Sequence, residues 1–210
     1  MKTDRPVGQI LEVMKSSTGR KTQILLVSAE LFSRKGYDKT SMKDIANKVG
    51  ISKSTLYCHI KNKHELLYTI MASDVMEYGI GGLQKIKEMS IPIDEKIRLG
   101  IHHHLSSYER YISEYVVMLH EKTDSLPYNL KKKIKEKFKA YTSLWNNLID
   151  EAITCEVVRR GLDPKIIVWS ILGMCNWVYK WYSKGGRLTN SEIADIFYQV
   201  MSQGAFVKRR

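Results

Sequence analysis

Residues 40 to 63 concentrate hydroxyl, aromatic and cationic side chains of the kind that contacts nucleic acid. A lysine such as Lys53 can donate to guanine acceptors or to phosphate, and the hydroxyls of Ser54 and Thr55 can contact either base edges or the backbone. Aromatic and cationic neighbours suit phosphate contacts, which fix the register of a protein on a duplex. The expected DNA contacts are Thr40, Ser41, Lys53, Ser54, Thr55, Tyr57, His59 and Lys63.

Two short helices joined by a tight turn are predicted to carry these side chains. In the first, apolar residues recur at helical spacing, at Met42, Ile45, Ala46 and Val49. Ser41 with Asp44 three residues later is a capping-box pattern, and Gly50 stands where a left-handed residue ends a helix. In the second helix, Leu56 and Ile60 are expected to face inward, so the polar residues face solvent. This arrangement is a helix-turn-helix unit.

Residues 22–71 also resemble the DNA-binding domain of the tetracycline-repressor (TetR) family. The matching features lie in residues 29–37, in Thr40-Ser41, in DIA at residues 44–46, in GISKSTLY at residues 50–57 and in KNKHELL at residues 61–67. Two positions depart from the family pattern: Ser54 where the family often has Gly, and Ile60 where it usually has Phe. The resemblance implies that the family's DNA-contacting positions have the same roles here.

Composition agrees with a polyanionic partner. The net charge is +12 and the pI is about 9.5, which favours nucleic acid before membrane. Three cysteines, Cys58, Cys155 and Cys175, show no metal-ligand spacing and favour a reduced, cytoplasmic chain. Residues 1–20 contain no apolar run of the kind that forms a signal peptide.

The remaining pattern predicts an all-α fold, because no segment alternates with period two for long enough to form a strand. Three domains are expected: a flexible N-terminal arm at residues 1–19, a three-helix head at 20–75 containing the helix-turn-helix at about 41–60, and an effector-binding and dimerisation body at 76–210. Helices are predicted at about 21–35, 62–79, 92–106, 108–121, 128–160, 163–184 and 189–203.

The last two helices are expected to pair two copies of the chain. Residues 166–179, IIVWSILGMCNWVY, are apolar nearly all the way round, so such a helix must be buried on every side. They are too few to span a bilayer. The apolar residues of the final helix that would complete the interface are Ile193, Ile196, Phe197 and Val200. A homodimer also suits a short recognition helix, since two heads can read one palindromic operator.

The body helices carry many large aromatic and polarisable residues, which suit an apolar cavity with a few polar anchors. The expected effector contacts are Tyr108, Tyr111, Tyr115, Met118, Trp145, Arg159, Trp169, Asn176 and Trp177. Residues 175–187 resemble a TetR subgroup that responds to acyl-coenzyme A thioesters, which implies an effector of that type. The alternative is that the aromatic residues are core, Asn176 a satisfied core amide and Arg159 or Arg160 a cation at a helix C-terminus.

Three other features are interpreted as structural. Successive residues of one helix point about 100° apart, so His102, His103 and His104 cannot converge on one metal ion. The lysine-rich run at residues 131–139 is interpreted as a solvated helix face, and Cys58 as a small apolar filler. No cofactor, metal site or catalytic motif is expected.

The sequence therefore predicts a ligand-responsive transcriptional repressor. Two alternatives stay open: a DNA-binding activator or architectural protein without an effector, and an all-helical enzyme or carrier that uses the aromatic cavity.

Overall fold

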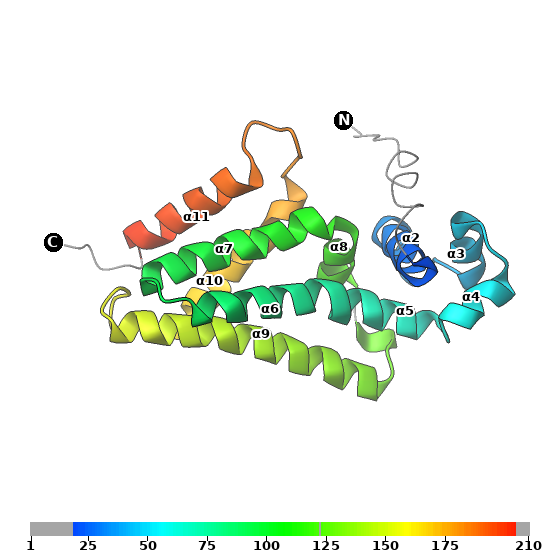
Figure 1. Cartoon of the computed structure of the whole chain (residues 1–210), viewed down its shortest axis with the longest axis horizontal. Coiled ribbons are helices and arrows are strands. Elements are labelled where there is room, and N and C mark those ends of the chain that lie inside the picture. The colour runs from blue at the N-terminus through cyan, green and yellow to red at the C-terminus, as the bar shows by residue number, and fades with distance from the viewer. Residues whose placement is uncertain (1–18, 122, 205–210) are drawn as a thin grey trace.

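The computed structural model describes residues 19–121 and 123–204, and residues 1–18 of the arm expected at 1–19 lie outside this part of the chain. All elements of the described residues are helices, which confirms the predicted all-α fold (Figure 1). In chain order they are α2 (Arg20–Lys35), α3 (Met42–Val49), α4 (Lys53–His59), α5 (Lys63–Thr69), the π-helical η1 (Ile70–Asp74), α6 (Val75–Glu88), α7 (Ile93–Arg110), α8 (Ile112–His120), the 3-10 turn η2 (Thr123–Ser125), α9 (Tyr128–Thr154), α10 (Pro164–Trp177), the 3-10 turn η3 (Val178–Lys180) and α11 (Asn190–Gly204).

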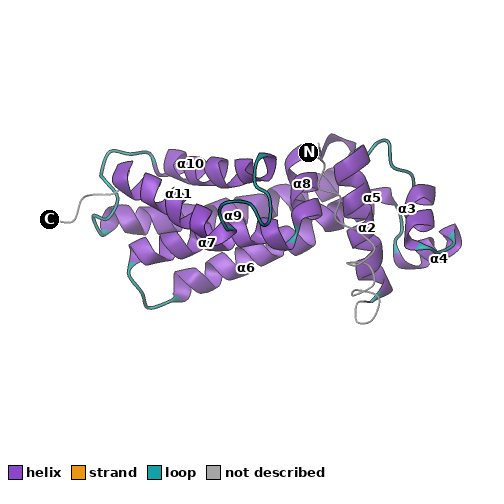
Figure 2. Ribbon diagram, turned by 90° about the horizontal axis from the view of Figure 1, so that it is seen from above, coloured by secondary structure: helices purple, strands orange, loops and turns teal. Residues whose placement is uncertain are grey.

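Two hydrophobic cores organise the molecule. The head core joins α2, α3, α4 and α5, and it also includes Val117 of α8 and Leu126. The body core joins α6, α7, α9, α10 and α11 around the fully buried Trp145. Figure 2 shows the head at one end of the body helices. The head therefore packs directly against a body helix, a contact that the sequence did not predict.

Predicted capping signals are confirmed in the head. Ser41 accepts from the amide of Asp44 and the Asp44 carboxylate accepts from the Ser41 amide, which completes a capping box. Gly50 ends α3 with a φ of 77°, in the left-handed region where a side chain would be strained. The hydroxyl of Ser52 then caps α4 by accepting from the amide of Thr55. These caps fix the angle between the two helices of the motif.

A continuous helical connector, formed by α5, η1 and α6, runs from head to body. The sequence predicted a helix that ends near residue 79, but the connector continues to Glu88. The glycines permit close packing instead: a Cβ on Gly82 would clash with the His103 ring, and one on Gly79 would lie 3.2 Å from Tyr141. Close approach of α7 and α9 is thus the reason for these two glycines.

Helix α9 ends at Thr154, so its expected extension to Arg160 is wrong. The chain turns there because Glu156 adopts a φ of 58° and the amide of Val158 donates to the carbonyl of Ala152 at 3.0 Å. This turn places Val158 in the body core, where its side chain is fully buried.

Helix α10 also ends before its expected limit. Its α-helical part ends at Trp177, and η3 follows instead of a continuation to Lys184. The turn buries Val178 completely in the body core. Among the described residues, no helix combines the length and apolar composition needed to cross a membrane.

Candidate nucleic-acid interface and ligand cavity

The second helix of the motif, α4, presents a polar face to solvent. Leu56 and the following Ile60 are 0% and 1% exposed and anchor the helix on the head core. The side chains that the sequence placed outward are all exposed: Lys53, Ser54, Thr55, Tyr57 and His59. The hydroxyl of Ser52 lies 2.8 Å from those of Ser54 and Thr55, so hydrogen bonds hold the start of this face in place. Such a helix can enter a major groove.

Thr40 and Ser41 have structural partners at the start of α3. Thr40 is only 1% exposed and its hydroxyl donates to the carbonyl of Gly36 at 2.9 Å. This burial departs from the expected side-chain contact with DNA. Ser41 is exposed, and its hydroxyl donates to the carboxylate of Asp44 at 2.8 Å. Hydrogen bonds from the Ser41 amide and hydroxyl lower the pKa of Asp44, so this cap is strongest when the carboxyl is ionised.

Lys63 lies beside the end of α4, against an aromatic ring. Its ammonium is 4.0 Å from the centre of the Tyr37 ring and donates to the carbonyl of Asp38 at 3.4 Å. Burial lowers the pKa of Lys63, and burial also raises the pKa of Tyr37 to about 12. The Tyr37 amide donates to the carboxylate of Glu121 at 2.8 Å, which ties this corner of the head to the segment after α8.

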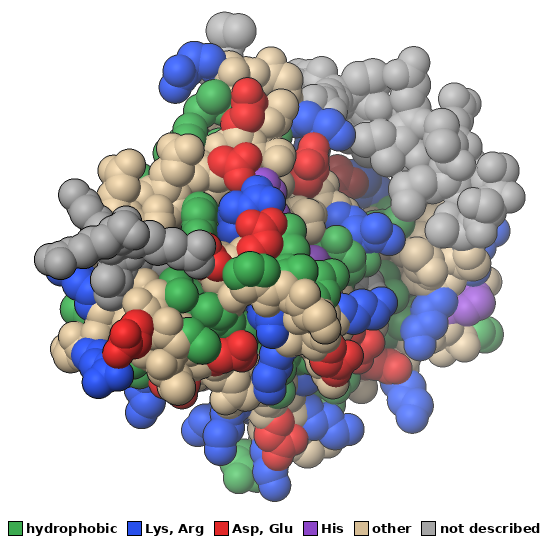
Figure 3. Space-filling view, turned by 60° about the vertical axis from the view of Figure 1, so that its left-hand side comes forward, with side chains coloured by type: hydrophobic (Ala, Val, Ile, Leu, Met, Phe, Trp, Pro, Cys, Tyr) green, Lys and Arg blue, Asp and Glu red, His purple; other side chains and the backbone are tan. Residues whose placement is uncertain are grey.

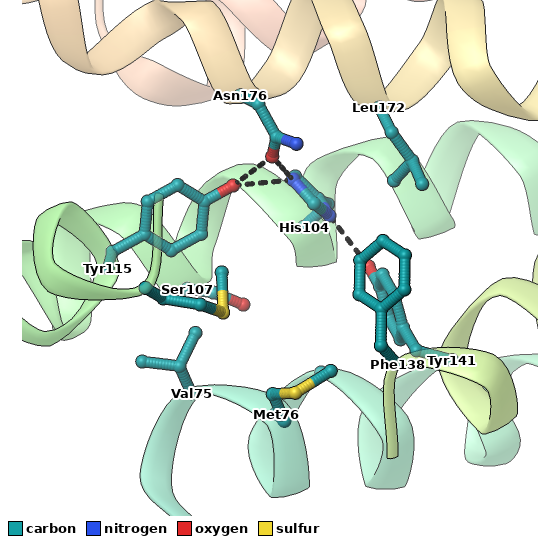
Figure 4. Close-up of a pocket in the computed structure, with 11 residues that line it drawn as sticks. Val75, Met76, His104, Ser107, Tyr115, Phe138, Tyr141, Leu172 and Asn176 are labelled. Carbon is teal, nitrogen blue, oxygen red and sulfur yellow. Dashed lines mark hydrogen bonds between the residues drawn. The ribbon is translucent and has the colours of Figure 1, made fainter. Parts of the chain in front are cut away.

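A narrow, partly open cavity of about 40 Å³ lies within the body (Figure 4). Its walls come from α6, α7, α8, α9 and α10, and most of the lining is apolar. The lining residues are Val75, Met76, Gly79, His104, Ser107, Tyr115, Met118, Phe138, Tyr141, Leu172 and Asn176. The polarity of this lining suits a small apolar ligand.

A hydrogen-bonded network forms the polar part of the cavity wall. The amide oxygen of Asn176 accepts from the Tyr115 hydroxyl at 2.6 Å and lies 3.0 Å from Nε2 of His104. The other ring nitrogen of His104, Nδ1, lies 2.6 Å from the Tyr141 hydroxyl. Because the Asn176 oxygen can only accept, Nε2 carries the proton and Nδ1 accepts from Tyr141. Complete burial lowers the pKa of His104 to about 4, so the ring is neutral at physiological pH.

The structure brings three of the expected effector residues to the cavity: Tyr115, Met118 and Asn176. Tyr108 and Trp145 lie in the body core instead, where they are 3% and 0% exposed. Trp145 is held there because its ring fills the space beside Gly100. Tyr111 packs edge-on against the Tyr78 ring at 5.6 Å, outside the cavity lining.

The other three expected effector residues lie at the surface. Trp169 and Trp177 are 50% and 60% exposed on α10, because that face of the helix points away from the body core. The guanidinium of Arg159 donates to the carbonyl of Gly204 at the end of α11. None of the three lines the cavity.

The sequence interpretation missed the role of His104. The three consecutive histidines do point in different directions, as expected: His102 contacts Asp195 at 2.7 Å, and His103 contacts the carbonyl of Tyr78 at 3.0 Å. Only His104 faces the cavity. Its spacing from Gly100 and Ile101 on the buried side of α7 is the signal that could have identified it.

An apolar surface on α10 and α11 is exposed in the single chain. We define this surface as Ile166, Trp169, Trp177, Ile196 and Val200, each between 42% and 63% exposed. By contrast, the end of the body away from the head shows acidic and basic side chains close together (Figure 3). Arg98 bridges Glu95 and Asp195 at 2.6 Å and 3.0 Å, which ties α7 to α11.

An exposed recognition helix on a separate head, together with a cavity in the body, defines a helix-turn-helix regulator of transcription with a ligand-binding domain. Residues 24–69 match the family of bacterial regulatory proteins described as the tetR family, and residues 90–205 match the tetracyclin repressor-like, C-terminal domain. The chain belongs to the TetR family.

Relatives and solved structures agree with this assignment. The fatty acid metabolism regulator protein of Bacillus subtilis (strain 168) is 26% identical over 161 residues, which cover 76% of this chain and 81% of that protein. The TetR-family regulator PfmR of Thermus thermophilus is 26% identical, with a TM-score of 0.79 over 89% of this chain and 99% of that chain. AibR, solved with isovaleryl coenzyme A and operator DNA, is 30% identical, with a TM-score of 0.74 over 87% and 97% of the two chains.

Proposed function

We propose that the protein is a homodimeric repressor that leaves a palindromic operator when an apolar or acyl-thioester ligand enters the body cavity. The observation that carries the proposal is the continuous connector of α5, η1 and α6. Leu66 and Met71 of this connector lie in the head core, while Val75 and Met76 line the cavity. A ligand that displaces the cavity wall therefore acts on the same helix that holds the head.

Sequence-specific binding follows from two heads on one duplex. A seven-residue helix such as α4 reads only a few base pairs, so high affinity requires a second copy at a fixed spacing. In this proposal Lys53 and Ser54 at its start contact base edges, while Tyr57, His59 and Lys63 contact phosphate. The ligand would change the separation of the heads and move them out of register with successive major grooves.

The apolar surface of α10 and α11 supports the dimer. Large exposed apolar residues that gather on adjacent helices are typical of protein interfaces, and a twofold axis lets one surface bind its own copy. Trp169 and Trp177 then act in dimerisation, although the sequence placed them in the effector site.

The effector class rests on the chemistry of the cavity and on the relatives. The lining is mainly apolar, with one polar wall at His104, Tyr115 and Asn176, so it suits an acyl chain better than a charged metabolite. AibR was solved with an acyl-coenzyme A thioester and operator DNA, and the B. subtilis relative is named as a regulator of fatty acid metabolism. An acyl-coenzyme A thioester is therefore the proposed effector.

The test begins with DNA sequences selected by the protein from a random pool. Binding of the labelled duplex is followed by fluorescence anisotropy while acyl-coenzyme A thioesters of increasing chain length are added. We expect one chain-length range to weaken DNA binding by about 5- to 150-fold, the usual range of allosteric coupling. A thioester that binds in the cavity without changing DNA affinity would contradict the regulatory mechanism.

The double variant Lys53→Ala/Tyr57→Ala provides the first prediction. Both side chains are exposed on α4 and neither is part of a core, so the variant should fold and dimerise normally. Loss of base and phosphate contacts in both heads should weaken operator binding by about a hundredfold or more, since each contact contributes on the order of 1 kcal/mol and occurs twice. Unchanged DNA affinity would show that α4 is not the reading helix.

A further inference from the structure

Helix α9 carries six lysines between residues 131 and 139. The sequence interpretation treated them as one solvated face. In the structure four of them lie on two flanks of the helix, Lys133 and Lys137 on one and Lys131 and Lys135 on the other, and side-chain contacts identify which neighbour each flank faces. This division separates lysines that already have partners from lysines that are available to a ligand.

One flank of α9 faces the connector. The ammonium of Lys137 lies 2.7 Å from the carboxylate of Glu77 on α6. Lys133 is 6.0 Å from the centre of the Tyr68 ring on α5. The ion pair of Lys137 therefore ties α9 to the connector, and Lys133 lies on the same flank.

The other flank faces α10. Phe138 lies on it, because its ring centre is 5.9 Å from that of Trp169 on α10. Lys135 and Lys131 precede Phe138 by three and seven residues, the spacings that place side chains on one side of a helix. Within the described residues neither lysine takes part in an ion pair. The row from Lys131 to Phe138 is about 10 Å long along the helix axis.

Phe138 also marks the edge of the cavity. It lines the cavity, yet 42% of the residue is exposed, so it borders both the interior and the solvent. Figure 4 shows Phe138 on the opposite side of the cavity from Tyr115. A ligand that extends out past Phe138 and follows α9 towards its N-terminus meets Lys135 first and Lys131 next.

We propose that Lys131 and Lys135 bind the phosphate groups of a nucleotide thioester whose acyl chain occupies the cavity. This inference rests on the proposed function and assigns it a second binding surface. The phosphates cannot enter the cavity, because burying their charge in an apolar lining is too costly. At the surface, two ammonium groups that pair with no carboxylate of the described chain provide the opposite charge, at a distance that the flexible arm of the thioester can span.

The experiment compares two ligands that share one acyl chain. The first is the acyl-coenzyme A that binds the wild-type dimer most tightly, and the second is the matching S-acyl pantetheine, which lacks the phosphates. Dissociation constants are measured by calorimetry at low and high salt, for wild type, for Lys131→Ala/Lys135→Ala and for the control Lys132→Ala/Lys133→Ala. The control removes the same charge from the same turns of α9, but from positions off the Phe138 flank.

We expect Lys131→Ala/Lys135→Ala to bind the coenzyme A thioester about tenfold more weakly at low salt, since two exposed ion pairs contribute up to about 1 kcal/mol each. The loss should shrink at high salt, and binding of S-acyl pantetheine should not change. The control should match wild type for both ligands.

Four outcomes would overturn the inference. Equal effects of the two double variants would show that the position of the lysines does not matter. Equal wild-type affinity for the two ligands would exclude a phosphate subsite and leave the acyl cavity intact. Weaker DNA binding by Lys131→Ala/Lys135→Ala, with thioester affinity unchanged, would assign the lysines to the DNA interface. If wild type binds neither ligand, the effector class fails together with this inference, whereas selection of DNA would still support the regulator.

Discussion

His104 is the side chain on which the polar wall of the cavity depends. It accepts from Tyr141 through one ring nitrogen and donates to Asn176 through the other, so both nitrogens are used only when the ring is neutral. A ligand that contacts this wall meets a fixed pattern of donors and acceptors. Tyr115 donates to the same Asn176 oxygen, and burial raises the pKa of its hydroxyl, which keeps that proton in place.

This buried histidine makes stability depend on pH. In the unfolded chain a histidine has a pKa of about 6.5, whereas burial lowers the pKa of His104 to about 4. The unfolded state therefore binds more protons between these values, and the free energy of unfolding falls as pH decreases through that window. The full loss is on the order of 3 kcal/mol. Burial of His103 lowers its pKa and acts in the same direction.

The check is urea unfolding between pH 7.5 and pH 4.5 for wild type and for His104→Gln. The glutamine can still donate and accept but does not titrate, so we expect its free energy of unfolding to fall less over this range. Parallel curves for the two proteins would show that His104 titrates in the folded state as it does in the unfolded state.

At the scale of single residues, the sequence predicted the outward side chains of α4 but fewer of the cavity residues. Exposure on a short amphipathic helix follows from periodicity, which is why Lys53 and Tyr57 were placed well. Which aromatic side chain faces a cavity depends instead on how the helices pack against one another. Trp145 fills the core and Trp169 lies at the surface, although both looked equally suited to a ligand site.

At the scale of elements, the connector illustrates how glycine can serve packing. The Gly82 position of α6 contacts the His103 ring of α7, and this ring also stacks on the Tyr78 ring at 4.6 Å. A ring nitrogen of His103 lies 3.0 Å from the Tyr78 carbonyl oxygen, which can only accept, so His103 is the donor. These contacts hold α7 against the connector close to the cavity wall.

Gly82→Ala and Gly81→Ala are a matched pair that tests this packing. At Gly82 the added methyl would clash with the His103 ring, so we expect a loss of about 1–3 kcal/mol in the free energy of unfolding. At Gly81 the added methyl would have no neighbouring heavy atom of the described residues within 4 Å. We therefore expect the free energy of unfolding to rise by about 0.5–1 kcal/mol, because alanine has the higher helix propensity. Denaturant unfolding measures both. Equal stability of the two variants would refute the close contact.

Helix starts were predicted better than helix ends. The caps at Ser41 and Asp163 are local, since each side chain bonds amides two or three residues away, and the sequence therefore shows them directly. The end of α9 depends on burial of Val158 in a core built by distant helices, and a periodic pattern does not contain that information. A periodic pattern also does not predict the π-helical turn η1, where the connector passes from the head core to the cavity.

At the scale of the whole molecule, the proposed function requires two copies of the chain. Val200→Arg places a charge on the apolar surface of α10 and α11, where Val200 is 57% exposed and its loss removes little from the core of one chain. We expect a folded monomer in analytical ultracentrifugation and a large loss of operator affinity, because one head reads only half of a palindrome. Tyr128→Arg, at a residue that is 81% exposed on α9, is the control and should stay dimeric. A dimeric Val200→Arg protein would place the interface elsewhere.

The central claim is that the cavity and the DNA-binding head are coupled through the connector. Coupling between two binding sites is reciprocal, so operator DNA must weaken ligand binding by the same factor by which ligand weakens DNA binding. The most direct measurement is the dissociation constant of the selected thioester, by calorimetry, for the free dimer and for the dimer saturated with operator. The account predicts weaker binding to the DNA complex, by about 5- to 150-fold. Equal dissociation constants would contradict it.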